Sequence, residues 1–304
     1  MTFPRIALTL IGAGLIASGS AAHAQALDGT LKKIKDTNTI TLGVRDASTP
    51  FSYLDDNQKP IGYSIDLCLK IVDAVKAELK MPGINVVMQP VTSATRIPLM
   101  ANGTIDLECG STTNNLERQQ QVSFVDTTFV TANRLMSKKA SNISKLEDLK
   151  GKTLVSTSGT SNLKQVTQLN GEKNLGINIV TANDHSNAFQ MVETDRAAAF
   201  AMDDILLYSL VAQSKSPSTY VISSEALSTE PYGIMLRKGD PAFKKVADGA
   251  IGAVFKSGEI NKIYAKWFLS PIPPKNINLN VPMSDTLKKV IANPTDSGDP
   301  AAYK

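Results

Sequence analysis

Apolar residues recur along the chain at two spacings, one typical of strands and the other typical of helices. Short apolar runs predict strands at 40–44, 84–88 and 105–109, and extended segments at 122–125 and 129–136. Helical spacing predicts helices at 65–80 and 96–101. The first part of the pattern therefore alternates strands with helices.

A second alternating set begins after a polar, lysine-rich segment at 137–150, which has the character of an entry to a second domain. Strands are predicted at 154–155, 177–180 and 197–202, with helices at 161–169, 186–194 and 205–212. An extended stretch at 234–237 and helices at 241–256 and 260–268 follow. Alternation of this kind predicts an α/β fold with mainly parallel sheets.

The two sets share a layout of helix, turn, strand and polar strand end. At one constant offset, Gly103 corresponds to Asp195 and Ser111 corresponds to Asp203. Ligands of open α/β sheets bind beyond the carboxyl ends of the strands. We therefore expect Ser111 and Asp203 to face a shared cleft from equivalent positions.

The two ends of the chain differ from the rest. Residues 1–24 combine a positive start at Arg5, an apolar stretch at 6–17 and a small-x-small ending at 22–24, which predicts a cleaved secretory signal peptide. The apolar stretch is shorter than the ~20 residues that a spanning helix needs. Removing these 24 residues from the 304-residue chain leaves 280. The last residues, 293–304, are polar with Pro and Gly, and we expect them to be loosely held.

The composition of the chain excludes several classes of partner and of binding site. The formal net charge of +4 is too small and too scattered to indicate a nucleic-acid partner. Two Cys and two His exclude a zinc array of Cys and His ligands and a disulfide-dense scaffold. Export permits a disulfide, so Cys68 and Cys109 are either bridged or two buried thiols. The sequence has no phosphate-binding loop and no G-x-S-x-G motif, and we expect binding without a cofactor.

Several segments in order resemble the amino-acid-binding periplasmic solute receptors of ABC importers. They are 43–45, 50–52, 62–66, 92–99, 102–115, 117–118 and 124–126. Four further segments narrow the resemblance to the glutamate/aspartate-binding branch, namely 157–161, 184–185, 201–204 and 271–275. The resemblance covers essentially all of residues 27–292.

The resemblance implies a two-lobed periplasmic binding protein type II fold, with each lobe a mainly parallel sheet flanked by helices and two hinge crossovers between them. Lobe one would be 25–132 with 236–304, and lobe two would be 133–235. The lobes would close on L-glutamate or L-aspartate in the periplasm and deliver it to a membrane ABC permease. The receptor is expected to be a monomer.

The same resemblance assigns the site residues. Arg96 would clamp the ligand's α-carboxylate, because a guanidinium forms two parallel bonds to one carboxylate. Ser111 and Thr113 would bind around the α-amino and α-carboxylate groups. Thr160 and Ser161, at a helix start, would complete the α-carboxylate pocket. Asp203 would face the ligand ammonium.

Ligand selection depends on three further residues in this interpretation. Arg45 and His185 would take the side-chain carboxylate from opposite lobes, and Ser93 would add a donor. From the sequence alone, a single histidine is more often structural, so its role comes from the resemblance. An arginine left without its carboxylate would penalise glutamine and asparagine.

Two other functions stay open. An exported dehydratase of the prephenate or arogenate type on the same fold would need a general acid, for which Glu108 and His185 are the candidates. A sensing module that docks on a signalling receptor is compatible with ligand binding.

Overall fold

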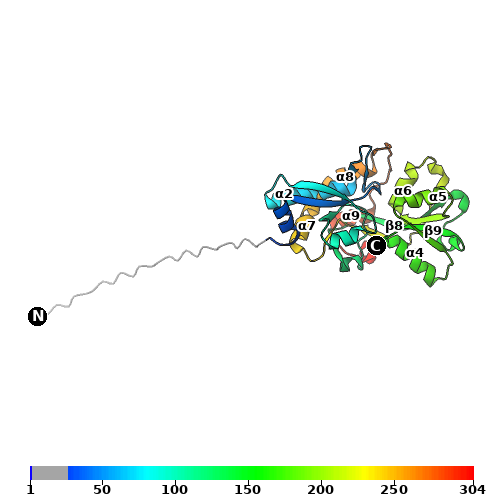
Figure 1. Ribbon diagram of the computed structural model, residues 1–304, viewed down its shortest axis with the longest axis horizontal. Helices are drawn as coiled ribbons and strands as arrows, with labels where there is room; N and C mark the ends of the chain where they lie inside the picture. Colours follow the sequence, from blue (N-terminus) through cyan, green and yellow to red (C-terminus); the bar gives the residue numbers. More distant parts are fainter. Residues whose placement is uncertain (2–26) are drawn as a thin grey trace.

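The computed structural model describes residues 27–304, together with Met1, and arranges them in two lobes (Figure 1). The expected signal peptide therefore lies outside the described residues, apart from Met1. No helix in the described part of the chain is long and apolar enough to cross a membrane. The two-lobed α/β architecture agrees with the expected fold class.

The first lobe is built on a five-stranded sheet in the order β5 (85–90), β1 (39–44), β6 (107–108), β14 (235–237) and β7 (122–124). Strand β1 is parallel to β5 and β6, whereas β14 is antiparallel to both of its neighbours. The helices of this lobe are α1 (29–37), α2 (63–79), α3 (96–101), α7 (241–256) and α8 (259–268). A small antiparallel sheet joins β2 (47–48), β3 (52–54) and β4 (60–61).

The second lobe repeats this order. Its sheet runs β10 (178–182), β9 (153–157), β11 (199–203), β8 (129–138) and β12 (220–222), and β13 (228–232) also pairs with β8. Strand β9 is parallel to β10 and β11, and β8 is antiparallel to its partners. The helices are α4 (161–172), α5 (185–193) and α6 (204–213). Figure 1 shows them in green to yellow-green, in the same lobe as β8 and β9.

The equivalence of the two halves extends to the turns. Gly103 and Asp195 both have positive φ, 79° and 59°, in the turn before the third strand of each sheet. Glycine adopts this left-handed conformation without steric cost. Strands β6 and β11 then lead to Ser111 and Asp203, as the shared layout predicts.

The chain passes between the sheets twice, after β7 and after β13. An aromatic cluster packs at this junction. The Phe51 ring lies 4.9 Å from the ring of Phe129 and 5.1 Å from that of Tyr232, between ring centroids. Phe268 stacks on Phe129 at 5.0 Å. All four rings are buried, so they form an apolar core where the chain crosses between the two sheets.

A disulfide joins Cys68 on α2 to Cys109 just after β6, which settles the alternative that the sequence left open. Both residues are fully buried. The bridge attaches the central strand of the first sheet to the helix behind it, two residues before Ser111.

The expectation of a loosely held tail is wrong. Helix α9 (285–292), which the sequence pattern did not reveal, leads into residues 293–304. The backbone N–H of Thr127 donates to the carbonyl of Thr295 at 2.8 Å, and the Tyr303 hydroxyl lies 2.7 Å from that of Thr127. Tyr303 is 5% exposed. A few tertiary hydrogen bonds thus hold a polar segment that has no periodicity of its own.

Candidate ligand-binding site

A small cavity lies between the lobes and collects eight of the nine predicted residues. It is lined by Ser93, Arg96, Ser111, Thr113, Thr160, Ser161, His185 and Asp203, and also by Asn162, Met202 and Leu206. It holds about 190 Å³ of space not filled by protein atoms. About 10 Å³ of it is open to the centre of a water-sized sphere, which is roughly the room that one water molecule needs, so the walls of the cavity lie close together. Arg45, the ninth residue, is buried and close enough to shift the pKa of His185.

Arg96 is the first residue of α3 and is 2% exposed. Its Nη1 donates to the carbonyl of Ser111 at 3.2 Å and to the hydroxyl of Thr112. The Nε of Arg96 has no partner among the described residues. Because buried donors are nearly always satisfied, this edge of the guanidinium is a natural contact for a ligand acceptor.

Glu108 is the buried counter-charge of this region. Its Oε1 lies 3.8 Å from Nη1 of Arg96, and its Oε2 accepts from the Thr112 hydroxyl. A buried charge is costly unless it is paired. Glu108 therefore holds Arg96 in place and offsets part of its charge.

Arg45 adds a second buried cation at the end of β1. Its pKa is lowered to about 10, chiefly by burial and then by repulsion from Arg96, while Glu108 opposes the shift. The guanidinium thus stays charged at neutral pH. Its Nη1 has no partner among the described residues. With Arg96 nearby, this group favours an anion in the cavity.

His185 opens helix α5 and is 2% exposed. Its Nδ1 lies 2.8 Å from the Thr157 hydroxyl, which leaves Nε2 for a ligand. Burial, and then Arg45 and Arg96, hold the pKa of His185 well below its usual value. The ring is therefore neutral at neutral pH and acts here as a hydrogen-bonding group rather than as a cation.

Asp203 ends β11 and has a pKa raised to about 7, chiefly by burial and then by the nearby Glu230. Its carboxylate accepts from Asn162 Nδ2 at 2.7 Å and from the Tyr232 hydroxyl. Two hydrogen bonds do not compensate the cost of ionising it here. A cationic group in the cavity would compensate this cost, because an opposite charge nearby favours the ionised form of the carboxyl group.

Thr160 and Ser161 lie at the start of α4. Thr160 is the N-cap, and its hydroxyl accepts from the backbone N–H of Leu163 at 3.1 Å. The Ser161 hydroxyl donates to Glu230 at 2.8 Å and reaches Thr113 of the other lobe at 3.3 Å. Thr160 therefore caps helix α4, and both Thr160 and Ser161 line the cavity.

Ser93 and Ser111 have buried hydroxyl oxygens without partners among residues 27–304. They are 2% and 5% exposed and both line the cavity. Leaving a buried polar group unsatisfied costs about 1–3 kcal/mol, so a ligand that bonded to them would recover part of that cost.

Sequence reasoning missed four polar residues around the cavity. They are Asn162 and Tyr232, which hold Asp203, Glu230, which accepts from Ser161, and Arg118, whose Nη2 reaches the Gly159 carbonyl at 3.3 Å. The resemblance had already drawn attention to the segment containing Arg118. The other three act through contacts within the second lobe, which form only when α4, β11 and β13 pack together.

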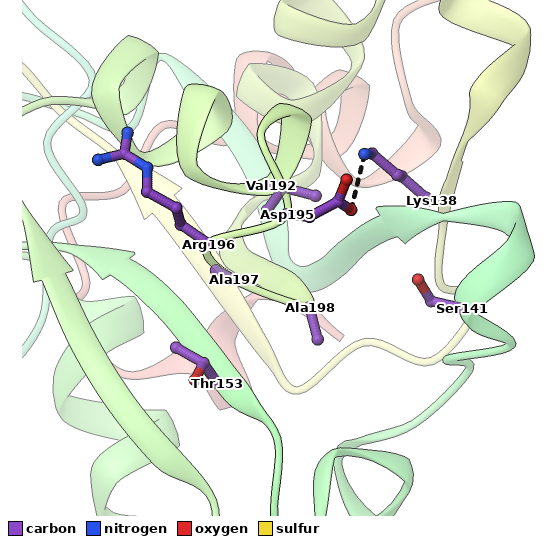
Figure 2. Close-up of a pocket in the computed structure, with 8 residues that line it drawn as sticks. All are labelled: Lys138, Ser141, Thr153, Val192, Asp195, Arg196, Ala197 and Ala198. Atoms are coloured by element: carbon purple, nitrogen blue, oxygen red, sulfur yellow. Dashed lines mark hydrogen bonds and ion pairs between the residues drawn. The ribbon is translucent and has the colours of Figure 1, made fainter.

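A larger hollow, about 570 Å³ by the same measure, lies on the second lobe near the start of β9 and β11. Figure 2 shows the ion pair of Lys138 and Asp195 beside it, with Arg196 extending in a different direction. The Asp195 side chain is 79% exposed, and this hollow holds none of the predicted residues. Size alone does not identify the binding site, since the smaller cavity is the one lined by the buried Arg96 and Asp203.

Residues 40–270 match the bacterial extracellular solute-binding proteins, family 3. The chain belongs to this family. It is 55% identical to the L-glutamate/L-aspartate-binding protein of Pseudomonas aeruginosa, over 96% of this chain and 98% of that one. It is 46% identical to the glutamate/aspartate import solute-binding protein of Escherichia coli, over 94% of each chain.

Solved structures of amino-acid-binding proteins share the fold. An ancestral arginine-binding protein bound to arginine superposes with a TM-score of 0.68 and 31% sequence identity, covering 76% of this chain and 98% of that one. As a family 3 member, the chain is a solute-binding protein rather than an enzyme.

Proposed function

We propose that this family 3 protein is a periplasmic receptor that binds L-glutamate or L-aspartate between its lobes and delivers it to a membrane ABC permease. The observation that carries the proposal is a small cavity lined by the buried Arg96 and the buried Asp203, with the buried Arg45 close enough to Arg96 to be repelled by it. An acidic amino acid brings two carboxylates and one ammonium, which matches this charge pattern. The names of the relatives in Pseudomonas aeruginosa and Escherichia coli support the same ligands.

The ligand backbone is assigned to one group of residues. The free Nε edge of Arg96 binds the α-carboxylate, with help from the hydroxyl of Ser111 and from Thr113. Thr160 and Ser161 approach the same carboxylate from the second lobe. Asp203 binds the ammonium, and this contact would restore its carboxylate to the ionised form.

The ligand side chain is assigned to Arg45, His185 and Ser93. Arg45 supplies a charge whose Nη1 lacks a partner among the described residues, and His185 supplies Nε2 from the opposite lobe. Glutamine or asparagine would leave this arginine without its anion. Rejection of amides therefore follows from the same group that attracts acids.

In this proposal the lobes are 25–132 with 236–304, and 133–235. The segments after β7 and after β13 serve as the hinge crossovers. Closure follows from ligand binding, because only the closed form lets both lobes contact the ligand. The receptor works as a monomer in the periplasm after removal of residues 1–24.

A dehydratase function is not favoured. The Glu108 carboxylate, one candidate acid, is engaged by Thr112 and Arg96, and the His185 ring already contacts Thr157. The relatives are named as binding proteins. An assay for products from prephenate checks this point directly.

Isothermal titration of the mature protein, residues 25–304, against the twenty amino acids tests the proposal. We expect binding of glutamate and aspartate and much weaker binding of glutamine and asparagine. Binding of neither acid would overturn the proposal. A cationic amino acid as the best ligand would overturn the assigned roles of Arg45 and Arg96.

A further inference from the structure

Glu230 is a buried carboxylate on β13 that stands behind the wall of the ligand cavity. It is 4% exposed and is not among the residues that line the cavity. Its Oε2 accepts from the Ser161 hydroxyl at 2.8 Å, and its Oε1 accepts from the Ser228 hydroxyl. Hydroxyls, rather than a cationic group, are its side-chain partners among the described residues. A buried charge with neutral partners alone is costly, so a cation close to this wall would stabilise it.

The bond to Glu230 decides which way the proton of the Ser161 hydroxyl points. A carboxylate accepts hydrogen bonds and does not donate them, so the single hydroxyl proton of Ser161 goes to Glu230. Ser161 also lines the cavity, and its oxygen lies 3.3 Å from that of Thr113. What Ser161 offers there is therefore a pair of oxygen lone pairs. In this orientation the side chain is an acceptor, which suits a donor such as an ammonium group.

Asp203 presents a second acceptor on the same wall. Helix α4 and strand β13 hold both carboxylates, because Asn162 and Tyr232 donate to Asp203 while Ser161 donates to Glu230. Alternate residues of a strand point to the same side, which places Glu230 and Tyr232 on one side of β13. The second lobe thus turns the Asp203 carboxylate and the Ser161 oxygen toward the cavity, with the Glu230 carboxylate behind them.

Electrostatic repulsion connects the two carboxylates. Glu230 helps to raise the pKa of Asp203 to about 7, second only to burial. An ammonium group beside them would relieve this repulsion, because an opposite charge favours the ionised form of a carboxyl group. The other titratable or charged groups around the pair are Tyr232 on β13, Asp204 on α6, Arg118 of the first lobe, Lys164 on α4, which pairs with Glu117, and the cavity residues His185 and Arg96.

We propose that Glu230 is a positioning residue for the ligand ammonium: it draws the Ser161 proton away from the cavity, so that Ser161 and Asp203 together accept from the ammonium. This inference rests on the proposed receptor function and adds to it a residue that does not touch the ligand. The backbone N–H of Ser161, in the first turn of α4, has no intrahelical acceptor and can still serve the α-carboxylate. Glu230 therefore contributes to the discrimination between an amino acid and the corresponding hydroxy acid.

The test compares Glu230→Gln with the matched control Glu225→Gln, which changes an exposed glutamate of the same lobe. Both substitutions remove one negative charge and keep the shape of the side chain. Calorimetry measures the affinity for L-glutamate and for L-2-hydroxyglutarate, in which a hydroxyl group replaces the ammonium. Titrations at pH 8 keep Asp203 mostly ionised, since its pKa is about 7. A series from pH 8 to pH 5 then gives the pH profile of glutamate binding.

For Glu230→Gln we expect the preference for glutamate over 2-hydroxyglutarate at pH 8 to fall by about tenfold, as when a charged hydrogen bond is weakened. The decline of glutamate affinity toward low pH should begin about one pH unit lower, because removing a like charge lowers the pKa of Asp203. Ser161→Ala should reduce the same preference, and the double variant should lose little more than either single variant, since coupled residues are not additive. Glu225→Gln should match wild type in both measurements.

A wild-type preference and pH profile in Glu230→Gln would overturn this role. Equal weakening of both ligands would overturn it too, because that pattern describes a structural residue with no effect on the ammonium. If wild type bound neither glutamate nor aspartate, the proposed receptor function would fail first. The pKa of Asp203, measured by carboxyl NMR without ligand, then decides the part of Glu230: a lower value in Glu230→Gln supports its action on this wall, and an unchanged value overturns it.

Discussion

Arg45 is a buried cation that the folded protein holds at a cost. Burial and repulsion from Arg96 both lower its pKa, and its Nη1 lacks a partner among the described residues. Buried groups whose pKa is perturbed by burial and by a specific charged neighbour are typical of functional sites. The residue is therefore better explained by a ligand anion than by folding.

Replacing Arg45 by methionine distinguishes a role in ligand binding from a role in folding. Affinity for glutamate and aspartate should fall by about 10- to 100-fold, as expected when a charged hydrogen bond is lost. The melting temperature should stay the same or rise, because repulsion with Arg96 disappears. Titration calorimetry and thermal unfolding measure the two effects. A collapsed melting temperature with affinity retained would make Arg45 structural.

Asp203 makes binding depend on pH. Its pKa is raised to about 7 in the folded protein, compared with about 4 for an ordinary aspartate. A folded-state pKa that is raised stabilises the protein at low pH, and this stabilisation is lost as pH rises through about 7. A ligand ammonium beside Asp203 lowers the pKa again, so binding should release a proton.

We therefore expect affinity to fall as pH drops from 7 toward 5, by up to about tenfold per unit, and proton release on binding near pH 6 to 7. Calorimetry in two buffers of different ionisation enthalpy measures the released proton. Asp203→Asn should bind weakly and release none from this site. Equal heats in both buffers for wild type would show that Asp203 does not change its protonation on binding.

At the scale of elements, periodicity located helices of different lengths, from the 6-residue α3 to the 16-residue α7. The predicted bounds of α3 and α7 agree with the structure, and α2 and α6 differ by one or two residues at their ends. The strands β2, β3 and β4 were missed because two or three residues carry no period. Their pairing with one another, rather than their composition, makes them strands.

The disulfide that connects α2 to the segment after β6 allows another prediction. Replacing Cys68 and Cys109 together by alanine removes a bridge that closes a loop with a sequence separation of 41. Loop-closure entropy then favours the unfolded chain by about 4 kcal/mol, so the free energy of unfolding should fall by about this amount. Binding should weaken as well, because Cys109 lies two residues from Ser111.

Urea unfolding of the variant and of the oxidised wild type measures this change. Wild type unfolded in the presence of a reducing agent is the matched control, and its stability should approach that of the variant. Equal stability of variant and oxidised wild type would mean that the bridge constrains little of the unfolded chain.

At the scale of the whole molecule, the site is assembled from segments far apart in the sequence. Residue types at strand ends and helix starts could be assigned from the resemblance, because each position is defined within one lobe. The hydrogen-bond partners of those residues could not be assigned in this way. Asn162 and Tyr232 reach Asp203 from α4 and β13, and Arg118 reaches Gly159 across the cleft. The first two pairs depend on how α4 and β13 pack within the second lobe, and the third depends on how the lobes meet; no local pattern encodes either.

The C-terminal segment also packs at the junction of the two lobes. The family match ends at residue 270, yet residues 293–304 lie beside the junction of the lobes, where Figure 1 places the C-terminus. The carbonyl of Asp296 accepts from Asn114 at 2.8 Å and from Gln119 at 2.9 Å. Its carboxylate pairs with Lys244 at 2.9 Å. The tail thus braces the strand end that carries the ligand cavity.

Truncation after Asn293 should lower the free energy of unfolding by about 2–4 kcal/mol, because several buried hydrogen bonds, each contributing about 1 kcal/mol, are lost together. Ligand affinity should also fall, since Thr127 lies in the crossover after β7 and loses its bonds to Thr295 and Tyr303. Tyr303→Phe is the matched smaller change. It removes only the hydroxyl that reaches Thr127 and Ser297, so it should cost about 1 kcal/mol and leave affinity nearly unchanged. Chemical unfolding and calorimetry distinguish the two variants. A truncated protein as stable as wild type, with the same affinity, would mean that the segment merely covers the junction and does not brace it.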